Sequence, residues 1–299
     1  MRKRFTIPSL EQVSGDKMLD VLKRYGIVAG VTEYAAKRGA ETYKLKGKYF
    51  VSKGMEPRGD LLNQTCCDYW TSTKADGSIG KAYTVSEFEI NAEPSWTSEN
   101  GIRLIVPLED IQDEIEDSYT ISGMNGDIKV VLYGEYPQSV VSHDEARELY
   151  RLYEDGVMKP TGKKYGAEGY SVERFYDGDE RDYEVDDYLE YELDGVKYVL
   201  AKCSVFDNGF GRYFWSRVEP IEWLVDEATG LAISKKCIVG GIPLKRNGLY
   251  LGNINKTKVQ KFIDNELSCD IEVKRNIVRK AIDGMMDETV EELENEKSL

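Results

Sequence analysis

Short runs of alternating apolar and polar residues dominate this chain, and helical spacing appears in only a few places. Met18, Leu19 and Leu22 share one side of a helix expected over 16–24. Thr32 is placed to cap a short helix over 33–37. The same spacing predicts a helix over 143–155 and two more near 255–267 and 270–285.

Alternation with a period of two predicts most of the strands, because successive side chains of a strand point to opposite faces. Residues 42–52 are predicted to form a hairpin around Gly47. Asp194-Gly195 is a turn signal between strands at 188–193 and 196–203. The remaining strands are expected at 81–90, 102–108, 128–133, 212–218, 221–226 and 230–235. Mixed strands and scattered helices predict an α+β fold.

An acidic segment that ends in Gly123 and Gly126 divides the chain. Such a composition favours a linker between folded parts. We therefore expect a first half over 1–110, a linker over 111–126, a second half over 127–285 and a charged tail over 286–299.

The charge of the chain limits its partners. Its 299 residues carry a net charge of −14, most of it after residue 126. An acidic surface repels phosphates, so direct binding to DNA or RNA is not expected. A basic protein partner, or mimicry of a polyanion, is compatible with this charge. The 20 tyrosines are typical of half-buried strands and of contact surfaces alike.

Cysteine usage and hydropathy favour a cytoplasmic protein. The five cysteines have no regular spacing, so neither a disulfide framework nor a zinc site is predicted. The basic start, Met1 to Arg4, is not followed by an apolar signal region. No apolar run is long enough to span a membrane. We expect no metal, no cofactor and no membrane partner.

Three strings in the second half carry a resemblance. They are Tyr133-Gly134-Glu135-Tyr136-Pro137-Gln138, then Val218-Glu219-Pro220-Ile221-Glu222-Trp223-Leu224-Val225, then Leu231-Ala232-Ile233-Ser234-Lys235. A later helix contains Phe262-Ile263-Asp264-Asn265. In this order and approximate spacing they resemble an uncharacterised domain family of gut Firmicutes and their mobile elements, with YPQ, PIEW and LLISK motifs.

The first half resembles the other end of the same family. Tyr69-Trp70-Thr71-Ser72 and Gly101-Ile102-Arg103-Leu104 match its closing "YW-x-S" and "G-V-R-P" strings, with leucine in place of the proline. Those endings resemble the C-type-lectin-like fold shared with formylglycine-generating enzymes. The resemblance implies a lectin-like mixed sheet with flanking helices, in circularly permuted order.

The exchanged order leads to a testable arrangement. If the ends of such a domain lie side by side, strand 102–108 should pair antiparallel with strand 128–133 across the acidic segment. The two halves would then complete one composite sheet. The alternative is two separate subdomains.

Catalytic chemistry has few candidates. His143 is the only histidine, and its context is that of a helix start capped by Ser142, with Glu145 as the capping-box partner. Adjacent Cys66 and Cys67 do not match the cysteine pair of formylglycine-generating enzymes. Glu219 and Glu222 are expected on opposite faces of a strand. The acidic run 177–187 lacks the EF-hand pattern, Gly240-Gly241 is not a phosphate loop, and Lys163, Lys164 and Arg174 lie among acidic residues.

A binding surface remains. The lectin-like resemblance implies that the ligand contacts a long irregular region, here 69–100, before the last strand. Aromatic residues among Ser, Thr and Asn are typical of adaptable contact surfaces. Trp70 is expected in the core. The ligand-binding candidates are Tyr69, Tyr83, Phe88, Trp96 and Arg103.

Three functions stay open. The first is a non-catalytic binding protein that recognises a protein partner, with a small molecule or a glycan as other possibilities. The second is an acidic inhibitor of a phage or other bacterial mobile element, acting on a basic nucleic-acid-handling host protein such as a defence nuclease. The third is a hydrolase built on the carboxylates of 177–226. The oligomeric state is not predicted.

Overall fold

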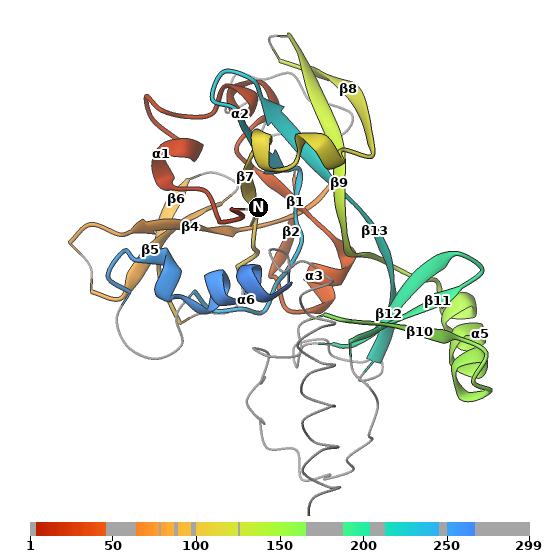
Figure 1. Ribbon diagram of the computed structural model, residues 1–299. Coiled ribbons are helices and arrows are strands. Elements are labelled where there is room, and N and C mark those ends of the chain that lie inside the picture. The colour runs from red at the N-terminus through yellow and green to blue at the C-terminus, as the bar shows by residue number, and fades with distance from the viewer. Residues whose placement is uncertain are drawn as a thin grey trace, which may run out of the picture.

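The computed structural model describes residues 4–45, 64–77, 79–86, 89–96, 100–124, 126–165, 188–203, 213–244 and 250–266 (Figure 1). Short helices lie against mostly antiparallel sheets, so the fold is α+β, as predicted. The expected helix 270–285, the charged tail, the acidic run 177–187 and Gly47 with the rest of its hairpin turn lie outside the described residues.

The largest sheet has eight strands and is organised around one long strand, β13 (Tyr213–Asp226). β13 pairs with β12 at its start, with β9 along its middle and with β14 at its end. Asp194 and Gly195 both have positive φ, the conformation that a tight hairpin turn needs between β11 and β12. The other strands of this part are β9 (Gly126–Val140), β10 (Lys159–Lys164), β11 (Leu189–Leu193), β12 (Val196–Lys202) and β14 (Leu231–Ser234).

The two strands expected at 212–218 and 221–226 are one strand, β13, which continues through Pro220. The predicted break was wrong. The register with β9 shifts between Pro220 and Glu222, so the residue without an N–H lies at an irregularity of the ladder. Proline is tolerated at such a bulge, and the strand continues through it.

The acidic segment after residue 110 forms regular structure. It contains the short 3-10 helices η1 (Leu108–Asp110) and η2 (Gln112–Glu114), and then strand β8 (Asp117–Gly123). β8 and β9 form a hairpin with seven consecutive residue pairs. Residues 117–123 are therefore part of the large sheet, where a linker was expected.

The two halves of the chain share their sheets, but not by the pairing expected from the sequence. β7 (Ile105–Pro107) pairs with β14, and β9 pairs with β8 and β13. The proposed pairing of 102–108 with 128–133 is therefore wrong. A second sheet has the order β15-β1-β3-β2, with β1 (Ala29–Val31), β2 (Thr42–Lys44) and β3 (Thr65–Cys67) from the first half and β15 (Lys236–Cys237) from the second.

The third sheet has the order β4-β5-β6 and comes entirely from the first half. Its strands are β4 (Tyr69–Lys74), β5 (Lys81–Val85) and β6 (Ile90–Pro94). The region 69–100, expected to be irregular, is thus largely a regular antiparallel sheet. It lies on the opposite side of the molecule from helix α5 (His143–Glu154) (Figure 1).

Both faces of the large sheet are covered. Val131 and Trp223 belong to a core that includes Phe5 and Phe262, whereas Val130 and Leu224 belong to a core with the buried residues of α2 (Asp20–Tyr25). A third cluster joins α5 to Trp215. The helices are α1 (Leu10–Val13), α2 (Asp20–Tyr25), α3 (Glu33–Lys37), α5 (His143–Glu154), η3 (Ile254–Lys256) and α6 (Lys258–Glu266).

Two predicted helix starts are confirmed, whereas the helix expected over 16–24 begins only at Asp20, as α2. Thr32 accepts from Ala35 N at the start of α3, and Ser142 accepts from Glu145 N at the start of α5. In the part of the chain that is described, no helix has the length and apolar character needed to cross a membrane.

Candidate functional site

The end of the third sheet where β4 turns into β5 carries exposed apolar side chains. Six large hydrophobic residues of the described chain are exposed, and Ile79, Trp96 and Leu251 among them lie at this end. Ile79 is 75% exposed, Leu251 73% and Trp96 54%. Single exposed apolar residues are ordinary, but a group of them marks a contact surface. We call Ile79, Trp96 and Leu251 the apolar end of the sheet.

The backbone places Ile79 and Trp96 close to each other. Ser95 N donates to Gly80 O at 2.9 Å, and each exposed residue is the chain neighbour of one member of this bond. Ser95 itself is completely buried. The turn and the end of β6 are therefore held together beneath the exposed side chains.

Leu251 lies at the same end of the sheet, although it is distant from β4 and β5 in the sequence. Tyr250 is buried, and its hydroxyl donates to Ser72 O on β4. A side chain at Gly252 would lie 3.7 Å from Cβ of Lys74, the last residue of β4. The segment 250–252 thus runs along the end of β4, and Leu251 points into solvent beside it.

Tyr83 supports the turn that carries Ile79. β5 alternates, with Ala82 and Thr84 buried and Tyr83 half-buried on the other face. The Tyr83 hydroxyl donates to the Asp76 carboxylate at 3.5 Å and accepts from Asp76 N at 3.3 Å. Tyr83 therefore holds the β4–β5 turn in place, next to the apolar end.

The outer edge of β6, which pairs with no second strand in the described part of the chain, is protected against pairing. Ser86 N donates to Glu89 O at 3.0 Å, and together with the Ser95–Gly80 bond this turns the backbone groups of Ile90, Ala92 and Pro94 away from β5. Pro94 has no N–H, and Lys81 Nζ donates to Ala92 O at 3.3 Å. Proline and lysine block edge pairing, so this site offers side chains and not backbone.

Two of the expected ligand-binding residues are core residues. Tyr69 is 1% exposed and Arg103 is fully buried. Arg103 Nε donates to Ser234 O at 2.9 Å, Arg103 Nη1 donates to Ile27 O at 3.1 Å, and the Tyr69 hydroxyl donates to the same Ile27 carbonyl at 2.7 Å. Burial raises the pKa of Tyr69 to about 12. These residues join distant segments and are closed to an external ligand.

The remaining candidates have different positions. Trp96 and Tyr83 belong to the apolar end or its support, and Trp70 is completely buried, as expected. Phe88 lies outside the described residues. Sequence reasoning missed Ile79 and Leu251. An isoleucine next to the turn glycine Gly80 could have indicated an exposed apolar side chain at Ile79. The position of Leu251 beside β4 depends on tertiary contacts, which the sequence does not display.

The motif residues of the second half bond to one another. Gln138 Nε2 donates to Glu219 O at 2.9 Å and to Pro220 O at 2.6 Å. Trp223 Nε1 donates to Tyr133 O at 2.9 Å. The YPQ and PIEW strings are therefore the two sides of the β9–β13 junction, where they stabilise the irregular part of the ladder.

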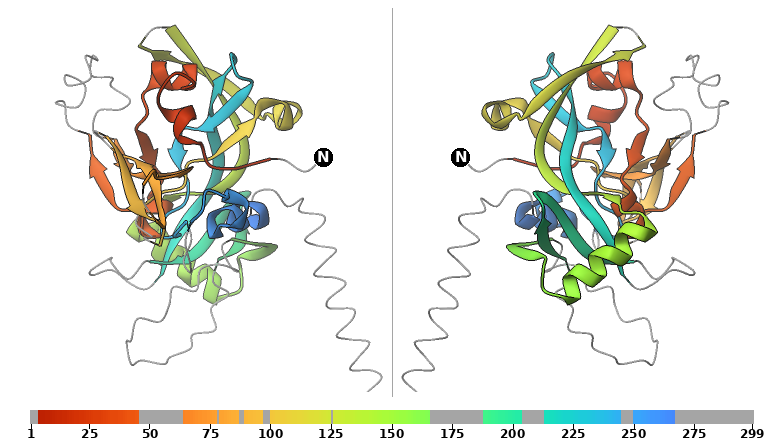
Figure 2. Two further views of the ribbon diagram at one scale, coloured as in Figure 1. Left: turned by 90° about the vertical axis from the view of Figure 1, so that its left-hand side faces the viewer. Right: turned by 90° about the vertical axis from the view of Figure 1, so that its right-hand side faces the viewer.

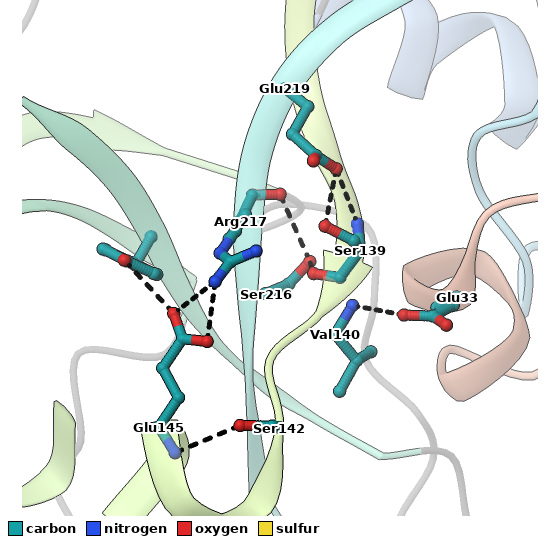
Figure 3. Close-up of polar contacts among 9 residues, drawn as sticks. Glu33, Ser139, Val140, Ser142, Glu145, Ser216, Arg217 and Glu219 are labelled. Carbon is teal, nitrogen blue, oxygen red and sulfur yellow. Dashed lines mark hydrogen bonds and ion pairs between the residues drawn. The ribbon is translucent and has the colours of Figure 1, made fainter. Parts of the chain in front are cut away.

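A polar network continues this junction into α5 (Figure 3). The Glu219 carboxylate accepts from Ser139 Oγ at 2.7 Å and from Ser139 N at 3.0 Å. Arg217 Nη2 donates to both oxygens of Glu145, at 2.7 and 2.8 Å. The Glu145 side chain thus binds β13, whereas a capping box would have directed it back to the start of its own helix. The network positions α5 and has no unused acid or base.

Glu222 belongs to a charged group with Tyr119 and Lys235. The Tyr119 hydroxyl donates to Glu222, and Lys235 Nζ donates to Glu222 Oε1 at 3.0 Å. Burial opposes ionisation of Glu222, but the Tyr119 hydrogen bond and the Lys235 charge outweigh it and lower the pKa of Glu222. Burial also opposes the charge on Lys235, but Glu222 and Tyr119 raise its pKa. A general acid at neutral pH needs a raised carboxyl pKa, so Glu222 is suited to an ion pair and not to donating a proton.

The other candidates for chemistry are also structural or isolated. His143 is exposed at the start of α5, and its Nε2 lies 3.2 Å from Arg147 Nη2. Cys66 and Cys67 are completely buried on β3. Within the described ranges, no three His, Cys, Asp or Glu side chains come together in a group that could hold a metal ion.

Comparison with known proteins gives no further guide to the site, because no family model, no curated protein and no solved structure matches this chain.

Proposed function

We propose that this protein is a non-catalytic binding protein that contacts a protein partner through the apolar end of the third sheet. The observation that carries the proposal is that Ile79, Trp96 and Leu251 are exposed at the same end of the third sheet, where β4 turns into β5. Tryptophan is among the residues that most often dominate binding energy at protein interfaces.

A rigid support favours this function. Tyr83 and Ser95 hold the turn from beneath, and Tyr250 ties the segment of Leu251 to β4. A preformed surface pays less ordering entropy on binding than a mobile one. Aliphatic residues beside tryptophan favour a protein partner over a glycan.

The C-type-lectin-like architecture, a finer description than the α+β fold, is part of the same proposal. Supporting it is the sharing of sheets between the two halves, since β7 of the first half lies in the large sheet and β15 of the second half lies beside β1. The likeness to the family with YPQ and PIEW motifs also stays a proposal.

Affinity capture from the native host, with quantitative mass spectrometry, tests the proposed surface. Trp96→Ala should weaken capture of the partner by about 30-fold, the effect of a dominant interface residue. Val196→Ser is the matched control, because Val196 is also exposed and apolar but lies at the start of β12. Capture that survives both Trp96→Ala and Ile79→Ser would show that the surface is wrong.

A second candidate function is the acidic inhibitor, because unneutralised acids follow β7. Arg4 pairs with Glu109 and Asp110, but Asp113 and Glu116 are exposed and have no ion pair with any described residue. Binding of a basic protein there would weaken steeply between low and high ionic strength. Insensitivity of the captured complex to salt would exclude it.

A further inference from the structure

The outer edge of β8 is a second open surface, separate from the apolar end. Within the described chain β8 pairs only with β9, through seven consecutive residue pairs without a register shift. Residues 117–120 are all exposed. The hairpin projects at one end of the molecule, and no other described strand runs along the outer side of β8 (Figures 1 and 2).

The direction of the backbone groups along β8 follows from its neighbours. Lys235 N donates to Glu222 O at 2.9 Å, so the backbone of Glu222 faces β14 and its opposite residue Leu132 faces β8. Leu132 O accordingly accepts from Glu116 N at 2.9 Å. Because the direction alternates along a strand, Tyr119 and Ile121 face β9. The backbone groups of Ser118, Thr120 and Ser122 therefore face outward.

This edge lacks the usual protection. Residues 117–123 contain no proline, no lysine and no arginine, unlike β6, which contains Pro94 and accepts a hydrogen bond from Lys81 of β5. The one local obstacle is Asp117, whose Oδ1 accepts from Ser118 N at 2.7 Å. The N–H groups of Thr120 and Ser122 have no partner among the described residues.

We propose that β8 pairs antiparallel with β8 of a second copy of this chain, centred on Thr120. In that register Thr120 lies opposite Thr120 of the second copy, and Ser118 lies opposite Ser122. Each Thr120 N–H donates to the other copy's Thr120 carbonyl, and each Ser122 N–H donates to the other copy's Ser118 carbonyl. The large sheets of the two copies become continuous.

The strand is self-complementary in this register. Tyr119 lies opposite Ile121 of the second copy, and aromatic residues pair well with β-branched ones across strands. Asp117 lies opposite Gly123, so no like charges face each other directly. A strand with a charged residue at its centre would place like charges opposite each other in this register. The uncharged centre of β8 therefore favours a second copy as the partner.

The dimer is weak and depends on salt. One strand edge buries much less than the ~1,200 Å² of a stable interface. Each copy also carries a net charge of −14, and screening reduces the repulsion between copies. Self-association should therefore rise with protein concentration and with ionic strength, opposite to the salt dependence of a complex with a basic protein.

Sedimentation velocity of the full chain over a range of concentrations and salt tests the proposal. The wild type should shift toward the dimer, and Thr120→Pro should abolish the shift. Proline removes an outward N–H and leaves the β8–β9 ladder in place. Thr120→Val keeps the N–H and should associate like the wild type. A monomer under all conditions, or association that survives Thr120→Pro, would overturn the proposal.

A disulfide trap tests the register without relying on affinity. In directly opposed residues the Cα atoms lie about 5.5 Å apart, which suits a disulfide. Thr120→Cys should therefore form a covalent dimer with oxidised glutathione. In Ser122→Cys the two introduced thiols lie four residues out of register, about 13 Å apart along the strand, and should not crosslink. Equal crosslinking of the two variants would contradict the proposed register.

Discussion

The carboxylate of Asp226 accepts a hydrogen bond from Val21 N at 2.9 Å, although the two residues are 205 positions apart in the sequence. Leu19, at the N-cap of α2, provides no side-chain cap, so Asp226 satisfies one of the free N–H groups of this helix. Asp226 also accepts from Thr229 N and Thr229 Oγ1, both at 3.0 Å, and is completely buried. One carboxylate thus joins the end of β13 to the start of α2.

Asp226→Ala should lower the free energy of unfolding by about 2–3 kcal/mol, because buried hydrogen bonds to a charged group are lost together. Urea unfolding followed by circular dichroism measures the change. Glu11→Ala removes an exposed ion pair with Lys17 and serves as the control, with little change expected. Equal stability of the two variants would show that Asp226 does not cap α2.

Arg103 and Tyr69 should contribute to stability rather than to partner binding. Tyr69→Phe loses the hydrogen bond to Ile27 O and should cost about 1 kcal/mol, and Arg103→Lys should cost about 2 kcal/mol because lysine cannot reach all the same acceptors. Unfolding curves provide these values. Loss of partner capture by either variant at unchanged stability would instead support a direct ligand role.

The Tyr119–Glu222–Lys235 group should make stability depend on pH at both extremes. The pKa of Glu222 is lowered from 4.5, so its contribution is present above pH 4.5 and is lost as pH falls through the lowered pKa. The pKa of Lys235 is raised from 10.5, so its contribution is present below pH 10.5 and is lost as pH rises through the raised pKa.

A double-mutant cycle measures this pair. Glu222→Gln and Lys235→Met should each destabilise the protein at pH 7, with a coupling energy of about 1 kcal/mol after allowance for exposure to solvent. Glu222→Gln should also flatten the acid side of the stability profile. A coupling energy of zero would contradict the ion pair.

Gly240→Ala should be strongly destabilising. A Cβ at this position would lie 2.4 Å from both Ala35 O and Ala40 N, at the end of α3. The backbone would have to move, at a cost of about 1–3 kcal/mol. Thermal unfolding of Gly240→Ala beside Ser118→Ala, an exposed position on β8, would show the difference. A neutral effect would mean that α3 does not pack so closely on this turn.

Local signals in the sequence predicted local structure well. Thr32 and Ser142 begin helices, and Asp194-Gly195 forms the turn between two predicted strands. These elements depend on interactions between residues close in the chain, which a single sequence displays directly.

Strand partners were not predictable in the same way. β7 pairs with β14 and β1 pairs with β15, because burial of both faces of the sheets selects the partner, and alternation alone does not encode it. Among the expected ligand-binding residues, Trp96 is exposed, whereas Tyr69 and Arg103 are buried and hydrogen-bonded within the core. Composition cannot distinguish an exposed aromatic residue from one that is buried and hydrogen-bonded.

The parallel pairing of β1 with β15 has a consequence for biosynthesis. β1 emerges from the ribosome early, whereas β15 follows only after most of the chain has been translated. The same delay applies to β7 and its partner β14. During translation, the strand edges of the first half therefore remain unpaired until β14 and β15 have been synthesised. Folding that depends on such distant contacts is slow. A chaperone that shields strand edges during translation should raise the yield of native protein.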